Sequence, residues 1–241
     1  MLDPLPDFQP IEGQKLKQVF VDQCSQMILS GKLDIGSKLP SERDLAIQMG
    51  VSRPVVHEGL LDLQAMGLIT LKSRFGAIVN DYRRSGSLDL LTALLRYNQN
   101  DLKPGLLADL LDLREHIETR IALLAAQNRT EQDLLLIGQI IDKEIRTDSR
   151  QIRRLVQLDF EFHLQLALAS GNQVYSLLLN SFQSIYTTYT AVFYQNPTVH
   201  AAVHTMHQEL QTALQARHAG WAEEIMHRLI RHGRENLQST P

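Results

Sequence analysis

The stretch from Leu39 to Val79 constrains the fold most, because it combines two short amphipathic helices, a tight turn between them and a hairpin. Ser41 can cap the first helix, with Asp44 three residues later as its capping-box partner. Ser52 can cap the second helix, and Pro54 is tolerated in its first turn because no N–H donor is needed there. Two helices joined by a turn of about three residues have the geometry of a helix-turn-helix.

The second helix is followed by two β-rich runs between residues 68 and 79. Arg53 and His57 lie four apart at the start of this helix, so they share a face and can point outward, as in a helix that enters a DNA major groove. Lys72 and Arg74 lie in the loop of the predicted hairpin. A basic hairpin beside such a helix is a wing able to contact phosphate or the minor groove. The alternative is a small helical hairpin with an unrelated ribbon, which would require all these signals to coincide.

The charge distribution and the cysteine content limit the partners and the cellular compartment that we expect for this chain. The net charge is −3, yet residues 31–84 hold eight Lys or Arg against six Asp or Glu, and residues 85–241 hold fourteen against seventeen. The basic excess near the helix-turn-helix is small, so specific DNA binding would need two copies, which predicts a homodimer.

The single cysteine, Cys24, excludes an internal disulfide and fits a reducing compartment. No run is long enough to span a bilayer and no signal peptide is recognisable, so we expect a cytoplasmic protein without a membrane partner.

Composition and periodicity divide the chain into four segments. Residues 1–13 are a proline-rich loose arm, 14–81 the winged helix-turn-helix, 82–87 a polar linker and 88–238 a helical domain. Within the last segment, helices are expected at 88–97, 104–127, 131–146, 152–169, 173–194, 197–217 and 221–237. The predicted fold is therefore mainly α, with an N-terminal winged helix-turn-helix and a C-terminal all-helical antiparallel bundle. Such a bundle can hold a ligand between facing helices.

Several side chains of the bundle could bind a metal ion. Asp159 and His163 are four apart and share one helix face, while His204 and His207 lie on a later helix. A carboxylate and imidazoles converging from two helices could bind a divalent metal such as zinc, nickel or manganese. Alternatively, Asp159 caps a helix or forms a salt bridge, and the histidines are ordinary interior or surface residues.

Arg114 and a run of aromatic residues are candidates for contact with an organic ligand. A guanidinium that faces the bundle interior could clamp a carboxylate, a thioester carbonyl or a phosphate, but Arg114 could equally pair with Glu118 four residues later. Tyr186, Tyr189 and Phe193 could line the mouth of a pocket or simply belong to the core.

The N-terminal motifs resemble the DNA-binding half of the GntR family of bacterial repressors. The resemblance is carried by the runs Pro40–Ala46, Gly50–Val55 and Arg74–Val79. It implies that the helix-turn-helix and wing bind DNA, with Arg53 and the residue four positions later reading base edges. His57 stands there instead of the family's usual arginine, and Gly59 replaces an alanine. Histidine offers one hydrogen bond where arginine offers two to guanine, which implies a different target sequence. The implied DNA-binding residues are Ser41, Arg43, Ser52, Arg53, Pro54, Val55, His57, Lys72, Arg74 and Gly76.

The helical domain is similar to the FadR subfamily, and two branches of the family imply different effectors. Members with a metal site use an aspartate, a histidine four residues later and two further histidines. Asp159, His163 and His207 match the first three, while Leu229 falls at the fourth position and His232 three residues beyond it. The span from Leu158 to Pro197 is also similar to acyl-CoA-responsive members, which implies a metal-free pocket for a long-chain acyl-CoA. The candidate effector-binding residues are Arg114, Asp159, His163, Tyr186, Phe193 and His207.

The sequence thus predicts a homodimeric regulator, not an enzyme, that binds a palindromic operator in double-stranded DNA. A small effector in the bundle, either an acyl-CoA or a metal-assisted carboxylate, would change operator affinity. The alternative hypothesis is a metal-dependent enzyme that uses Asp159, His163 and His207. Such an enzyme would need a general base, and the winged helix would have no role in it.

Overall fold

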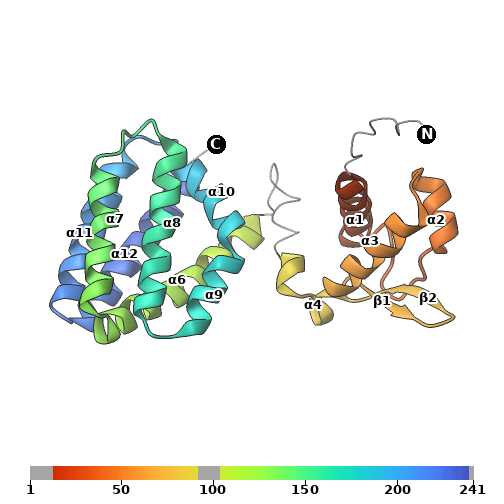
Figure 1. The fold of residues 1–241 in the computed structure, drawn as a ribbon, viewed down its shortest axis with the longest axis horizontal. Coiled ribbons are helices and arrows are strands. Elements are labelled where there is room, and N and C mark those ends of the chain that lie inside the picture. The colour runs from red at the N-terminus through yellow and green to blue at the C-terminus, as the bar shows by residue number, and fades with distance from the viewer. Residues whose placement is uncertain (1–12, 92–103, 239–241) are drawn as a thin grey trace, which may run out of the picture. The chain divides into compact units, whose positions relative to one another are not determined.

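The computed structural model describes residues 13–91 and 104–238 (Figure 1). The chain divides into two compact units, residues 1–97 and 98–241, which are described separately below. The predicted N-terminal arm lies outside the described residues, except for Gly13, which begins the first helix. The expected helix at 88–97 is described only as far as residue 91, and residues 88–91 are helical. Among the described residues, no helix has both the length and the apolar character needed to cross a membrane.

The first unit is a helical domain with a two-stranded wing. Its elements are α1 (Gly13–Leu29), α2 (Glu42–Met49), α3 (Arg53–Ala65), β1 (Ile69–Lys72), β2 (Gly76–Val79) and α4 (Tyr82–Ser85). The helix α1 packs along α3 because both bury apolar side chains in one core, including Phe20, Cys24, Val56, Leu60 and Leu63. The predicted order of helix, helix-turn-helix and hairpin is therefore confirmed.

The caps of the two short helices agree only in part with prediction. The hydroxyl of Ser41 accepts a hydrogen bond from the backbone N–H of Asp44 at 3.2 Å, and Gly50 ends α2 in the left-handed conformation at φ 65°. The predicted cap by Ser52 is wrong, because its side chain accepts no capping hydrogen bond from the part of the chain that the structure describes. Pro54, the second residue of α3, removes one of the two N–H donors that such a cap can use. The other donor, the N–H of Val55, is present but makes no bond to the hydroxyl of Ser52.

The wing is an antiparallel hairpin that is fixed to its surroundings. Its strands pair in the register Ile69↔Val79 to Lys72↔Gly76. The backbone N–H of Leu71 donates to Oε1 of Gln64 on α3 at 2.9 Å, so the hairpin is hydrogen-bonded to that helix. Residues 37–39 run along the other strand, where Leu39 N–H donates to the carbonyl of Ala77. The wing is therefore held from both sides.

The expected linker at 82–87 differs from the structure. Residues 82–85 form α4, and the hydroxyl of Ser85 donates to the carbonyl of Gly67 at 2.8 Å. Gly67 has φ 78°, and a Cβ there would lie 1.8 Å from the carbonyl oxygen of Ser85, so only glycine permits this approach. Leu90 is buried in the core of the first unit. The segment after the wing therefore packs onto the DNA-binding unit.

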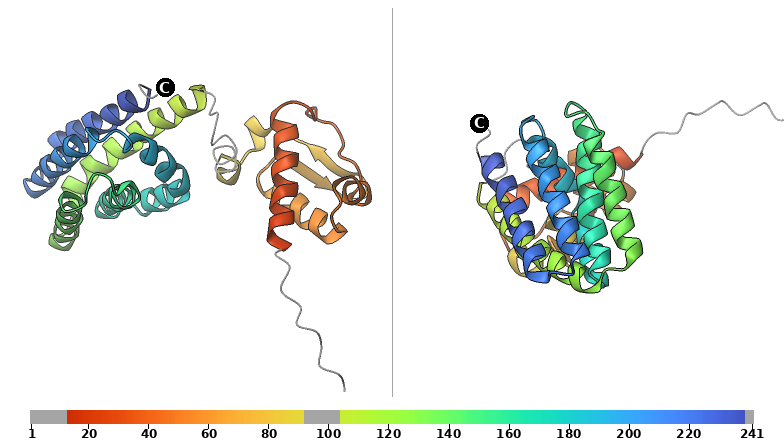
Figure 2. Two further views of the ribbon diagram at one scale, coloured as in Figure 1. Left: turned by 90° about the horizontal axis from the view of Figure 1, so that it is seen from above. Right: turned by 90° about the vertical axis from the view of Figure 1, so that its left-hand side faces the viewer.

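The second unit is an antiparallel helical bundle. Its described elements are α6 (Pro104–Asn128), α7 (Glu131–Ile145), α8 (Ile152–Ala169), α9 (Gln173–Ser181), α10 (Gln183–Phe193), α11 (Val199–Gln215) and α12 (Ala219–Gln238). Figure 2 shows α6 and α12 side by side and antiparallel, and α6 also packs against α8 and α11. This central position of α6 brings its side chains next to residues from several other helices.

The helix predicted at 173–194 is two helices with a break at Phe182. Phe182 has dihedral angles of −95° and 2°, and α10 begins at the next residue. The hydroxyl of Ser181 donates to the carbonyl of Leu177, a back-bond that bends helices. The break changes the direction of the chain beside α6, where it forms one wall of a cavity.

Candidate functional site

The first unit carries its candidate residues on the surface. Two of them, Arg53 and His57, lie in the first turns of α3, the second helix of the helix-turn-helix. Val55 is half-buried, and the other nine predicted DNA-binding residues are exposed: Ser41, Arg43, Ser52, Arg53, Pro54, His57, Lys72, Arg74 and Gly76. Their arrangement is that of a helix and a basic hairpin that can contact a duplex from the first turns of α3 and from the wing.

His57 makes a contact that the sequence did not predict. Its Nδ1 lies 2.9 Å from Oε1 of Glu42, the first residue of α2. Because a carboxylate only accepts hydrogen bonds, Nδ1 carries the proton and Nε2 remains for another partner. Glu42 thus fixes the orientation of the imidazole at the position where the family usually has an arginine.

The second unit brings three predicted metal ligands together in its interior. Asp159 and His163 come from α8 and His207 from α11, and one ligand atom from each lies within 4.8 Å of the others. Their exposed fractions are 5%, 2% and 0%. The ring of His207 stacks on that of Phe162 with 3.7 Å between centroids, so packing fixes its position.

Each imidazole of this cluster is backed by a buried carboxylate. Glu118 on α6 forms an ion pair with Nδ1 of His163. Glu144 on α7 lies 3.0 Å from Nδ1 of His207 and 3.3 Å from Nδ1 of His204. A carboxylate on one ring nitrogen orients the other nitrogen toward a metal and makes it a better ligand. Nε2 of His207 is buried and has no hydrogen-bond partner among the described residues.

The buried charges shift the pKa values of these groups. Burial alone would raise the pKa of Glu118, but the charges of Arg114 and His163 outweigh it and hold the pKa at about 2. Burial likewise opposes ionisation of Glu144, yet His207 and His204 keep its pKa below the ordinary value. Burial lowers the pKa of His207 and the charge of Glu144 raises it more, so the net shift is upward. Both glutamates are therefore carboxylates at neutral pH.

The two oxygens of Asp159 each accept a hydrogen bond from a buried tyrosine. The hydroxyl of Tyr186 donates to Oδ2 at 2.5 Å and that of Tyr194 to Oδ1 at 3.1 Å. Burial raises the pKa of both tyrosines well above the usual value, so both remain protonated donors. A carboxylate has about four lone-pair sites, so these two bonds leave capacity for a cation.

The cluster contains more negative than positive permanent charge. Glu118, Glu144 and Asp159 are three buried carboxylates. Among the described residues, Arg114 is the one arginine that reaches this group: it pairs with Glu118 and is linked to Asp159 through the hydroxyl of Tyr186. With neutral histidines, the formal charge of these four groups is −2. Uncompensated buried charge is costly, so a divalent cation or protonated histidines would stabilise the cluster. The donor set of carboxylate and imidazoles fits zinc, nickel or manganese.

Arg114 lies between the cluster and an apolar cavity. It forms an ion pair with Glu118, and its Nη2 donates to the hydroxyl of Tyr186 at 2.7 Å, with the guanidinium carbon 4.1 Å from the centre of that ring. The predicted pairing of Arg114 with Glu118 is present, and the side chain of Arg114 is still 25% exposed, so it can also contact an anionic ligand. Its pKa is raised despite burial, because Glu118 and its acidic neighbours stabilise the cation.

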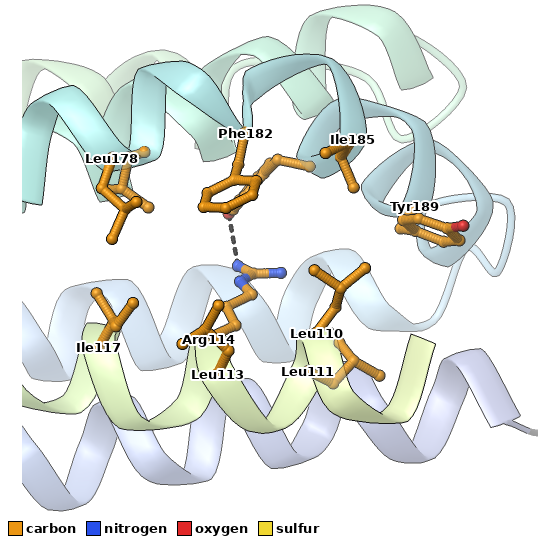
Figure 3. A pocket seen from close by; sticks show the side chains of 11 residues that line it. Leu110, Leu111, Leu113, Arg114, Ile117, Leu178, Phe182, Ile185 and Tyr189 are labelled. Atoms are coloured by element: carbon orange, nitrogen blue, oxygen red, sulfur yellow. Dashed lines mark hydrogen bonds between the residues drawn. The ribbon is translucent and has the colours of Figure 1, made fainter. Parts of the chain in front are cut away.

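The apolar cavity has a volume of about 80 Å³ and lies between α6 and the broken helix α9–α10 (Figure 3). Figure 3 shows leucine side chains of α6 facing Leu178, Phe182 and Ile185. Among the residues that the structure describes, Arg114 is the one charged residue that lines the cavity. A second cavity, of about 30 Å³, is lined by Arg114 together with Asp159 and His163. Arg114 therefore borders both spaces.

The other predicted effector residues have mixed positions. Tyr186 lines the apolar cavity, and Phe193 lines the smaller one, although both belong to buried surfaces with 7% exposure. Leu229 also lines the smaller cavity, where the family's fourth metal ligand is expected. His232 is not part of the cluster and instead contacts the ring of Phe193.

The sequence reasoning missed two residues, Glu144 and, as a partner of His163, Glu118. A signal for each was present. Glu144 continues the apolar spacing Ile137–Ile141 on α7, and Glu118 lies between Leu111 and Ala125 on the buried face of α6. A carboxylate at a core position of an amphipathic helix indicates a buried partner.

The comparisons with known proteins agree with this geometry. Residues 16–79 match the family described as bacterial regulatory proteins of the gntR family, and residues 80–238 match the FadR C-terminal domain. The chain belongs to the GntR family of transcriptional regulators, in its FadR subfamily. The family consists of DNA-binding regulators and not of enzymes, so α3 is the recognition helix and β1–β2 the wing of a regulator with a C-terminal effector domain.

Relatives in the GntR family cover most of the chain. The regulator LutR of Bacillus subtilis is 36% identical over 159 residues, which are 66% of this chain and 70% of LutR. The regulator Mce2R of Mycobacterium tuberculosis is 32% identical over 74% of this chain and 73% of its own length. The fatty acid metabolism regulator protein of Yersinia enterocolitica is 29% identical over 78% of this chain and 76% of its own.

Solved structures share the fold of this GntR-family chain at low identity. The structure of Lar from Listeria monocytogenes has a TM-score of 0.61 and 15% identity, covering 98% of this chain and 100% of the other. A Streptococcus agalactiae GntR protein has a TM-score of 0.51 and 23% identity, covering 91% and 99%.

Proposed function

We propose that a small anionic effector, bound in the helical unit, switches the operator affinity of this regulator. In this proposal Asp159, His163 and His207 hold a divalent metal, and Arg114 binds a carboxylate of the effector. The single observation that carries the proposal is the convergence of the three ligand atoms within 4.8 Å, with buried carboxylates behind both imidazoles. Arg114 lines the same small cavity as Asp159 and His163, within reach of an anion bound there.

The residues around the cluster would each have one task. Glu118 and Glu144 orient the imidazoles, and the metal, when bound, supplies positive charge that attracts the carboxylate. Arg114 can offer a forked pair of N–H donors once it exchanges its bond to Tyr186 for the effector. Ligand binding would therefore move Tyr186, a residue of α10, which gives an effector-dependent change inside the bundle.

The switch would act on a homodimeric cytoplasmic repressor. Two protomers place two recognition helices about one duplex turn apart on a palindromic operator. An effector that prefers a different arrangement of these helices lowers the affinity. A coupling free energy of about 1–3 kcal/mol changes affinity by roughly 5- to 150-fold, which is enough for regulation.

Metal analysis tests the first part of this proposal. Purified protein would be loaded with zinc, nickel or manganese, dialysed and analysed by inductively coupled plasma mass spectrometry and native mass spectrometry. We expect one metal per chain in the wild type and less than a tenth of this in His207→Ala. His116→Ala is the matched control, because this histidine is 75% exposed on α6. Equal metal content in wild type and His207→Ala would contradict the site.

A long-chain acyl-CoA is a second candidate effector, supported by the apolar cavity beside Arg114 and by the name of the Yersinia relative. Pockets for organic ligands usually have volumes of about 300–1,000 Å³. The cavity of about 80 Å³ would have to open widely between α6 and α9–α10 to hold an acyl chain. The cavity that Arg114 shares with Asp159 and His163 is smaller still, about 30 Å³, so a small carboxylate would also need an opening there. The small carboxylate is the first choice because of the three converging ligand atoms, and not because of the cavity volume.

The two effectors can be separated in one experiment. Native mass spectrometry before and after addition of palmitoyl-CoA, with metal analysis on the same sample, reports both ligands. A metal-free dimer that takes up palmitoyl-CoA would support the acyl-CoA and make Asp159 and His163 structural. One metal per chain without acyl-CoA uptake would support the metal-assisted carboxylate.

A further inference from the structure

Phe75, at the tip of the wing, is exposed in a way that folding does not explain. Its exposed fraction is 68%, whereas Phe20, Phe160, Phe162 and Phe193 are all below 8%. It belongs to neither of the hydrophobic cores formed by the described residues. Single exposed apolar side chains are common on this chain, and Ile47 is 69% exposed. Phe75 differs from them because it is an aromatic ring at the tip of a basic wing, where such hairpins meet the minor groove.

The loop holds Phe75 in a defined position. The backbone N–H of Phe75 donates to the carbonyl of Lys72 at 3.0 Å, which closes the turn. Arg74 has φ 66°, a left-handed conformation that residues other than glycine seldom adopt, and Gly76 follows with φ 88°. Since the wing is also hydrogen-bonded to α3 through Gln64, the ring keeps a fixed place relative to the recognition helix.

The charges around Phe75 identify the partner. Lys72, the last residue of β1, and Arg74, the residue before Phe75, are both exposed. A hairpin tip that combines an apolar ring with two nearby cations is complementary to a groove whose rims are phosphates. The family supplies a DNA duplex as the partner of this wing.

We propose that Phe75 inserts into the minor groove of the operator and partly unstacks one base step. Apolar side chains inserted in this way kink the duplex, and pyrimidine–purine steps yield most easily. Phe75 is then a specificity-determining residue that reads deformability, while Arg53 and His57 read base edges in the major groove. Lys72 and Arg74 bind phosphates near the inserted ring. The inference rests on the DNA-binding function and needs no effector.

Base unstacking can be measured directly. An operator would be selected from a random duplex pool with the wild-type protein, and 2-aminopurine would replace adenine at successive positions outside the major-groove contacts. We expect its fluorescence to rise at one step in each half-site when the wild type binds. The rise should disappear with Phe75→Ala and persist in part with Phe75→Leu, which keeps an apolar wedge.

Affinity measurements give an independent readout. Phe75→Ala should weaken binding about 10-fold or more, since a buried phenylalanine contributes this much or more by its apolar surface. The dependence on salt concentration should not change, whereas Lys72→Ala should reduce the salt slope by about one per protomer, or about two for the dimer. Replacing the affected pyrimidine–purine step should weaken wild-type binding and leave Phe75→Ala nearly unaffected.

Ile47→Ala is the matched control, because Ile47 is 69% exposed on α2 and lies outside the wing. It should leave the affinity and the fluorescence pattern unchanged. The proposal would be overturned if Phe75→Ala bound with wild-type affinity, or if 2-aminopurine stayed stacked at every position. It would also be overturned if Phe75→Ala altered the oligomeric state but not DNA binding, since the ring would then contact another protein chain.

Discussion

The DNA-binding unit and the helical unit keep their functional side chains in opposite environments. Nine of the ten candidate DNA-binding residues are exposed, whereas Asp159, His163 and His207 of the effector unit have at most 5% exposure. The exposed residues make few contacts within the fold, so function and stability can be changed separately in the first unit. In the second unit the candidate ligands are also core residues, so a substitution there affects both.

The largest expected effect is the loss of operator binding in Arg53→Ala. A bidentate contact from arginine to a base contributes about 1–3 kcal/mol, so removing one from each protomer weakens a dimer by at least about 30-fold. The stability of the protein should stay within about 0.5 kcal/mol, because Arg53 is exposed. Fluorescence anisotropy with a labelled operator measures the first quantity and denaturant unfolding the second.

The control for this change is Arg150→Ala, which removes an exposed arginine from the helical unit. It should bind the operator as the wild type does. If Arg53→Ala destabilised the protein as much as it weakened binding, the separation of function from stability in the first unit would not hold.

Glu118→Ala should show the opposite behaviour in the helical unit. The substitution leaves Arg114 and His163 without their buried partner, and breaking a buried pair costs about 3–5 kcal/mol. Trp221 is the single tryptophan of the chain and packs against the core of this unit, so its fluorescence reports the urea unfolding. Glu223→Ala, at an exposed residue of α12, should cost under about 0.5 kcal/mol. Similar losses for the two variants would mean that the buried cluster is not a source of stability.

Gly59→Ala tests how tightly the core behind the recognition helix is packed. A Cβ at this position would lie 2.3 Å from the ring of Phe20, so we expect a loss of about 1–3 kcal/mol. Cys24, the single cysteine, lies in the same core, and the denaturant dependence of its labelling reports this unit. Adding Phe20→Leu should recover part of the loss. A fully stable Gly59→Ala protein would show that Phe20 moves aside without cost.

Cys24 provides the smallest expected effect. Burial raises the pKa of its thiol to about 11, so the folded protein resists ionisation that the unfolded chain undergoes near pH 9. Because the pKa of the thiol is higher in the folded state, the protonated thiol stabilises the folded protein at lower pH. This contribution to the free energy of unfolding is lost as the pH rises through about 9 to 11. Iodoacetamide should therefore react slowly with the native protein at pH 9 and rapidly in urea. Cys24→Ala should lose less stability than the wild type between pH 8.5 and 10.5, and an equal loss would argue against this assignment.

The sequence predicted the first unit more fully than the second for a physical reason. The cap at Ser41, the turn at Gly50 and the alternating wing are local signals, each contained within a few residues. The prediction for Ser52 was wrong although a donor is present: Pro54 removes one N–H, but that of Val55 remains and is not used by the side chain of Ser52. The break at Phe182 was missed because the apolar spacing continues through it on both sides.

The cluster in the second unit depends on contacts that are distant in sequence. Asp159 and His163 could be paired from their spacing, His204 and His207 were candidates on a later helix, and the family resemblance selected His207. Glu144 lies 63 residues before His207, and no local rule connects the two. The apolar cavity beside Arg114 arises from packing between α6 and α9–α10, and the smaller cavity also involves α8, α11 and α12. Neither could be predicted from periodicity. Local motifs could thus be predicted from the sequence, whereas the convergence of residues that are distant in the sequence is shown only by the tertiary structure.

The contact between Gly59 and Phe20 also restricts the evolutionary history of the recognition helix. A chain with alanine at position 59 and phenylalanine in its present position at 20 would have an overpacked core. The expected order of changes is therefore glycine at 59 first and phenylalanine at 20 second, because the reverse order passes through a less stable protein. Lineages that share Phe20 should share Gly59, and reconstructed intermediates with Phe20 and an alanine at 59 should be the least stable of the four combinations.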